Sequence, residues 1–194
     1  AQTEKELPAL VAAGGVDEEI LEDLDTSRVV HCARTTAPIV VDGALDEPDW
    51  HRVYPADCFF VYQEGRKIAD APTQARLLHD DEAIYASFSC WLPGDSAIFA
   101  QERERDGMVL EDDAVELFLA PQELEGSYVH FMVNALGSVR DQIVTATENE
   151  AGVTDFERDP GWNAEGLQIA ATQREGRWDV EMAIPLTDIG ATSL

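Results

Sequence analysis

The sequence has few basic residues. Only 13 lysines and arginines stand against 39 aspartates and glutamates in 194 residues, which gives a formal net charge of −26 at pH 7. Nucleic-acid binding needs a basic face that neutralises phosphates, and anionic membrane surfaces attract basic segments. The charge therefore excludes unassisted nucleic-acid binding and disfavours anionic membranes. Lys5 and Lys67 are the only lysines, a bias that fits either a salt-adapted surface or a GC-rich genome.

Cysteines and long apolar runs are also scarce. Cys32, Cys58 and Cys90 are too few for a disulfide scaffold and match no CxxC metal spacing, although one pair could form a disulfide. No run approaches the roughly 18 apolar residues of a membrane helix. We expect no transmembrane segment in this chain.

Motifs for catalysis are missing as well. The four histidines show no HExxH spacing, no serine lies in a GxSxG elbow, and no glycine-rich phosphate loop occurs. With 39 acidic residues, some pair always resembles the acid and nucleophile of a glycosidase, so their number is uninformative. We expect a protein that is not an enzyme.

The first 26 residues form an acidic N-terminal arm. Within it, residues 16–24 have apolar side chains at helical spacing and acidic residues in the first turn, which predicts a short amphipathic helix. A solvated arm without this helix is the alternative. The chain starts at Ala1-Gln2, as after signal-peptidase cleavage, although a trimmed chain would look the same. We expect a periplasmic or extracellular protein.

From Ser27 the pattern changes to short runs rich in Val, Ile, Phe and Tyr, separated by Gly, Pro and Asp. This predicts an all-β domain over residues 27–194, folded as an antiparallel β-sandwich. Hairpins are expected at 73–90, with an acidic turn, at 127–144, with a turn at Leu136-Gly137, and at 162–184, with a turn at Glu175-Gly176. The predicted strands are 28–33, 57–62, 73–79, 83–90, 114–120, 127–134, 138–144, 162–173 and 177–184.

Four segments have physical interpretations of their own. In 39–50, Asp42-Gly43 favours a turn, and Asp46 is expected to cap a short helix whose Trp50 fills one end of the sandwich, as core more often than as a ligand platform. In 111–121, alternation puts Glu116 on the less apolar strand face. Segment 75–85 is the first hairpin, and 178–185 is an apolar strand.

Taken together in this order, the four segments resemble carbohydrate-binding module family 9. The resemblance implies a jelly-roll or immunoglobulin-like sandwich in which a sugar lies between two tryptophans and contacts polar groups on nearby strands. The first tryptophan falls on Leu110 here, and a sugar-binding arginine falls on Met132. The strand glutamate matches Glu116, and Asn134 ends the strand that carries Met132.

The second tryptophan of the family lies beyond the segment 178–185, and this sequence ends at Leu194. We therefore expect a sandwich that lacks its last strands or is completed by another polypeptide. A displaced sugar site would need another platform, and Trp91 and Trp162, both at expected loop junctions, are the candidates. Core packing is the alternative for each.

Calcium is a second ligand that the resemblance suggests. Hard cations bind several carboxylate and carbonyl oxygens, and two expected turns are acidic. Solvated turns are the alternative interpretation. The candidate ligands are Asp80, Asp81 and Glu82 in one turn, and Asp112 and Asp113, with Glu111, in the other.

The sequence thus predicts a non-catalytic binding module. Because Leu110 and Met132 replace sugar-binding residues, we favour an accessory or structural subunit docked on a larger envelope or periplasmic complex. The alternative is a genuine carbohydrate-binding module with a displaced sugar site. A haem-binding electron-transfer subunit, with Met108 or Met132 as axial ligand, is a third hypothesis that the resemblance suggests.

Overall fold

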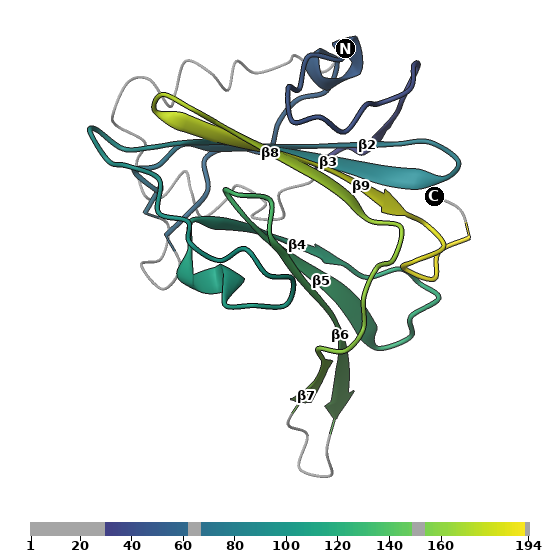
Figure 1. Cartoon of the computed structure of the whole chain (residues 1–194). Coiled ribbons are helices and arrows are strands. Elements are labelled where there is room, and N and C mark those ends of the chain that lie inside the picture. Colours follow the sequence, from purple (N-terminus) through teal and green to yellow (C-terminus); the bar gives the residue numbers. More distant parts are fainter. Residues whose placement is uncertain (1–29, 62–66, 149–153, 193–194) are drawn as a thin grey trace, which may run out of the picture.

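The chain folds as two β-sheets packed face to face (Figure 1). The computed structural model describes residues 30–61, 67–148 and 154–192. One sheet has the order β1 (Ala33–Arg34), β2 (Thr73–His79), β3 (Ala83–Trp91), β9 (Arg177–Pro185), β8 (Gln168–Arg174). The other has the order β4 (Ala114–Leu119), β5 (Ser127–Asn134), β6 (Val139–Glu148), β7 (Thr154–Asp159).

All strand pairs are antiparallel except β1–β2, which is parallel. Two short 3₁₀ helices, η1 (Pro48–His51) and η2 (Val109–Glu111), are the helical elements within the described residues. The all-β sandwich is confirmed. The acidic arm at 1–26 and its helix at 16–24 lie outside the described residues.

The core forms where the alternating strands face each other. Val115 of β4 and Val180 and Met182 of β9 belong to one hydrophobic core between the sheets, and Leu117 and Leu119 of β4 pack against it. The three expected hairpins are confirmed, and Gly137 (φ 82°) and Gly176 (φ 71°) occupy turn positions that require left-handed backbone.

Four expectations about strands were wrong. Residues 57–61 form no strand, and only single bridges join Phe60 to Ile68 and Ala56 to Ala75, because the left-handed backbone of Cys58 (φ 54°) interrupts an extended run. The strand expected at 28–33 is reduced to Ala33–Arg34 in its described part, and the one expected at 162–173 begins only at Gln168. Strand β7 was missed, because all six of its residues are exposed and show no alternation of burial.

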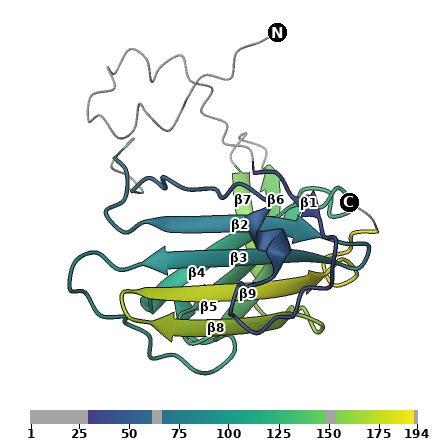
Figure 2. The same cartoon turned by 90° about the horizontal axis from the view of Figure 1, so that it is seen from above.

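The segment from β1 to η1 lies across the outer face of the five-stranded sheet (Figure 2). Glu181 of β9 points outward, is fully buried, and accepts hydrogen bonds from Asp42 N (3.1 Å), Gly43 N (2.9 Å) and Trp50 Nε1 (2.9 Å). Trp50 is therefore buried on this face rather than at one end of the sandwich. The N-cap of η1 is Glu47, not Asp46, and it makes no side-chain cap.

All three cysteines lie in the described part of the chain, and no disulfide joins any two of them. Cys32 is exposed and Cys90 is buried in the core. The disulfide that the sequence left open is absent. Within residues 30–61, 67–148 and 154–192, no helix is long and apolar enough to span a membrane.

Candidate functional site

A cleft of about 570 Å³ opens where β3 ends and β2, β4 and β9 begin. Its walls come from both sheets and from two loops, because the unpaired edge of β4 leaves the sandwich open there. The lining residues used below are Phe59, Cys90, Trp91, Asp113 and Glu116. An apolar cleft with a few converging polar groups is the usual form of a ligand site.

Aromatic side chains form one part of the cleft wall. Trp91 stands at the end of β3, and the Arg177 guanidinium lies 5.4 Å from its ring centroid. Arg177 is not among the lining residues, so it supports the ring from outside the cleft. Phe59 is 42 % exposed. Both residues line the cleft.

The thiol of Cys90 contributes an inert surface to the same wall. Burial raises its pKa to about 12. The group therefore stays protonated near neutral pH and supplies no thiolate nucleophile.

Glu116 is oriented by a chain of hydrogen bonds on the outer face of the four-stranded sheet. Its Oε2 lies 2.7 Å from His130 Nε2, and His130 Nδ1 lies 3.3 Å from Gln142 Nε2. Burial lowers the pKa of His130. A neutral imidazole that donates from Nε2 to Glu116 and accepts from Gln142 at Nδ1 satisfies both contacts. The arrangement fixes one carboxylate oxygen, and no described residue donates a hydrogen bond to Oε1.

Asp113 is positioned by the loop that precedes β4. Its Oδ2 accepts the Phe99 backbone N–H at 2.8 Å, and its own N–H donates to the Phe99 carbonyl at 2.7 Å. The adjacent Asp112 turns away and accepts the N–H groups of Gln101 and Glu102, both at 2.9 Å. Only Asp113 of this pair reaches the cleft.

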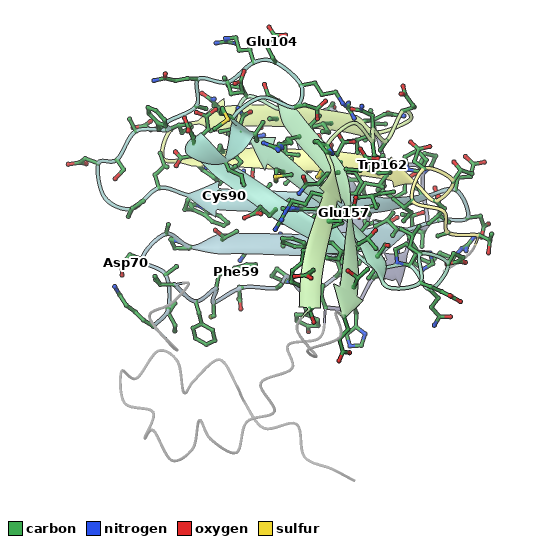
Figure 3. All side chains as sticks on the ribbon, turned by 90° about the horizontal axis from the view of Figure 1, so that it is seen from below. Phe59, Asp70, Cys90, Glu104, Glu157 and Trp162 are labelled. Carbon is green, nitrogen blue, oxygen red and sulfur yellow. The ribbon has the colours of Figure 1, made fainter. Side chains whose placement is uncertain are left out.

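The cleft brings together two of the four residues expected to bind a ligand, Trp91 and Glu116. Asn134 is fully buried and its side chain makes four hydrogen bonds: Nδ2 donates to Glu102 O and Asp112 Oδ2, and Oδ1 accepts from the N–H groups at 136 and 138. Trp162 packs on the edge of Phe131, with ring centroids 6.2 Å apart. Figure 3 shows Trp162 on the opposite side of the molecule from Phe59.

The aspartates of the acidic turn before β3 already make hydrogen bonds within the protein. Asp80 accepts the N–H groups of Glu82 and Ala83 (both 2.8 Å) and the Tyr85 hydroxyl (2.7 Å), while Asp81 pairs with Arg34. In the described residues, no group of three or more His, Cys, Asp or Glu side chains is arranged to hold a metal ion. The calcium hypothesis for Asp80, Asp81, Glu82, Asp112 and Asp113 stays a prediction.

The two replaced family positions and the methionines are also located. Leu110 is 54 % exposed in η2, whereas Met132 is buried beside Glu116 in the cross-strand register. Met108 is exposed immediately before η2. The haem hypothesis for Met108 or Met132 stays a prediction, which a visible absorption spectrum of the purified protein tests.

Sequence reasoning missed Phe59 as a cleft residue. Phe59 and Phe60 are adjacent in a segment expected to be a strand. A strand puts the two rings on opposite faces, but the sequence does not say which face contacts a ligand. Cys58, the residue before Phe59, has a left-handed backbone conformation, and no residue type in this segment predicts that conformation.

Comparisons with solved structures give several matches to this sandwich. A candidate carbohydrate-binding protein from Bacteroides uniformis aligns with a TM-score of 0.58 and 16 % identity, over 81 % of this chain and 72 % of that chain. A family 9 carbohydrate-binding module from Caldicellulosiruptor kristjanssonii in complex with glucose aligns with a TM-score of 0.53 and 17 % identity, over 80 % and 68 %. At these identities the similarity shows the fold alone.

The same kind of module from Caldicellulosiruptor kristjanssonii in complex with cellotriose gives a TM-score of 0.54 and 15 % identity, over 80 % of this chain and 66 % of that chain. No curated protein matches the sequence. Residues 41–194 match the family described as carbohydrate family 9 binding domain-like. Because this match spans most of the chain, the protein belongs to the carbohydrate family 9 binding domain-like family.

Proposed function

We propose that the protein is a non-catalytic module that binds a glycan in the cleft at the edge of β4. The observation that carries the proposal is the convergence of Trp91, Phe59 and two carboxylates on one cleft of about 570 Å³. The complexes of family 9 modules with glucose and cellotriose support it at the level of the fold. Polysaccharides built from such sugars are found outside the cytoplasm, so we also propose that the protein is exported.

Each part of the cleft has a role in such binding. The C–H face of a pyranose packs on an aromatic ring, and Trp91 offers a ring that Arg177 holds in place. Glu116, with Oε2 held by His130, presents Oε1 as an acceptor for a hydroxyl group. The position of Trp91 differs from that of the stacking tryptophan that the family resemblance predicts, because Leu110 occupies that family position in this sequence.

Isothermal titration calorimetry with cellotriose and other neutral oligosaccharides tests the proposal. Trp91→Ala is expected to weaken binding at least about tenfold, because the stacking surface is lost. Tyr54→Ala is the matched control, because Tyr54 is 94 % exposed and does not line the cleft. Unchanged binding by Trp91→Ala contradicts the proposed site, and the absence of any glycan ligand contradicts the function.

The unpaired edge of β4 favours a second function, docking as an accessory subunit on a larger complex. Ala135 N–H donates to the Asp113 carbonyl at 3.0 Å, and Asn134 N–H donates toward β6, to Ser138. The alternation of an antiparallel ladder therefore directs the backbone groups of Ala114, Glu116 and Phe118 away from β5, and no strand of the described chain pairs with them. Such an edge can accept a strand from a partner.

Native mass spectrometry of the protein purified from its source tests this second function. A stoichiometric complex that Phe118→Pro weakens supports docking at β4, because proline removes an outward N–H and leaves the β4–β5 ladder intact. Phe118 does not line the cleft, but its ring stacks on His130 with ring centroids 4.0 Å apart, so glycan binding by this variant reports whether the contact between His130 and Glu116 is retained. A monomer without a bound partner contradicts the docking function.

A further inference from the structure

The charged residues that line the cleft are all acidic. Asp113 and Glu116 are those residues, and no lysine, arginine or histidine of the described chain lines the cleft. Arg177, which stacks on Trp91, is already paired with Asp179 at N···O distances of 2.9 and 3.0 Å. Within the described residues, the cleft lining therefore carries negative charge without a compensating cation.

Each of the two carboxylates keeps one oxygen without a hydrogen bond from the described chain. Phe99 N–H occupies Asp113 Oδ2 and His130 occupies Glu116 Oε2, which leaves Asp113 Oδ1 and Glu116 Oε1. Burial lowers the pKa of His130, so its ring does not cancel the charge of Glu116 near neutral pH. Ionised carboxylates only accept hydrogen bonds, and an ammonium group is their strongest donor.

The aromatic wall suits the same cation. Ring faces of tryptophan and phenylalanine attract an ammonium group as well as the C–H face of a sugar. We propose that the cleft recognises glycans with free amino groups, of the glucosamine type, in preference to neutral glycans. This inference rests on the proposed glycan-binding function. The same carboxylates, and the net charge of −26, repel uronic acids and sulfated sugars.

Calorimetry with two matched trimers tests the preference. The trimer of β-1,4-linked glucosamine differs from cellotriose in carrying an amine at C2 of each ring in place of a hydroxyl. We expect the amino trimer to bind about tenfold or more tightly, and the advantage to shrink in high salt. Glu116→Gln should remove most of the advantage. Glu125→Gln, a change at an exposed carboxylate away from the cleft, should retain it.

The possible results separate this inference from the function it rests on. Equal affinities for the two trimers overturn the amino-sugar preference and leave glycan binding standing. Binding of neither trimer overturns both. Amino-trimer binding that survives Trp91→Ala reveals attraction to the acidic surface alone and overturns the preference. Loss of binding in Trp91→Ala together with the selective effect of Glu116→Gln supports it.

Discussion

Arg105 is the charge partner of a carboxylate that lies wholly inside the protein. Asp141 is fully buried on the core side of β6, and both of its oxygens accept from Arg105 Nη2, at 2.8 and 2.7 Å. Ala164 N–H donates to the same carboxylate at 2.8 Å. The pair holds the loop before η2 and the loop after β7 against the four-stranded sheet.

Removing Arg105 is expected to destabilise the fold. Arg105→Ala leaves the buried Asp141 without its cation, which should lower the free energy of unfolding by about 3 kcal/mol in urea denaturation. Arg103→Ala is the matched control, because Arg103 is exposed and its side chain makes no ion pair in the described chain. Equal losses in the two variants would contradict the role of the pair.

Asp49 makes stability depend on pH in a defined direction. Hydrogen bonds from Thr36, above all from its backbone N–H at 2.6 Å, lower the pKa of this carboxyl below its usual value of 3.8. A lowered pKa means that the stabilisation is complete above the unfolded-state value and is lost as pH falls toward the folded-state value.

The variant Asp49→Asn should therefore unfold at lower urea concentration than the wild type at about pH 6, and the gap should narrow steadily as the pH falls below the unfolded-state value of 3.8. Urea midpoints measured across this range check the expectation. A gap that is independent of pH would show that Asp49 does not act through its charge.

At the scale of elements, the hairpins followed from the sequence because two of their turns carry glycine, the third is a run of acidic residues, and their strands alternate. Strand β7 was not predicted from the sequence. It pairs only with β6 and all its residues are exposed, so it shows no alternation of buried and exposed positions. The site was predicted in part: Trp91 and Glu116 meet in the cleft, but they lie on different sheets. Which residues meet across a sandwich depends on packing that no local pattern encodes.

Gly43 shows how one turn attaches a whole segment. Its φ is +78°, and a Cβ placed there would lie 2.9 Å from Thr172 Cγ2, on β8. Gly43→Ala should therefore cost more stability than Gly94→Ala, where φ is +57° but nothing lies within 4 Å. The Gly94 variant should lose about 1 kcal/mol from backbone strain alone, and thermal unfolding ranks the two. Equal losses would contradict the close approach of Gly43 to β8.

For the whole molecule, the net charge predicts that self-repulsion is the dominant electrostatic effect. With a net charge of −26, the folded state should be stabilised by added NaCl, because the Debye length falls from about 30 Å at 0.01 M to about 3 Å at 1 M. The melting temperature measured by calorimetry should rise over this range. A constant melting temperature would indicate that the acidic side chains lie far enough apart in the fold for their repulsion not to reduce its stability.

Calcium can be distinguished from this screening. At matched ionic strength, a site formed by the acidic turns should raise the melting temperature in millimolar calcium but not in magnesium, because magnesium dehydrates reluctantly and demands stricter geometry. Equal shifts in the two salts would leave screening as the whole effect. Asp80→Asn is unsuitable as a probe, because Asp80 also holds the turn before β3.

The attachment of the first segment to Glu181 also has a mechanical consequence. Two backbone groups and Trp50 share this one carboxylate at the middle of β9, and β9 lies between β3 and β8. Tension applied at the N-terminal side of the domain would therefore reach the interior of the five-stranded sheet through β9 as well as through its edge strand β1. Strands loaded along their length resist separation better than strands peeled from an edge, because many hydrogen bonds must break together. A domain tethered at its N-terminal side would therefore keep the shape of its cleft under mechanical tension.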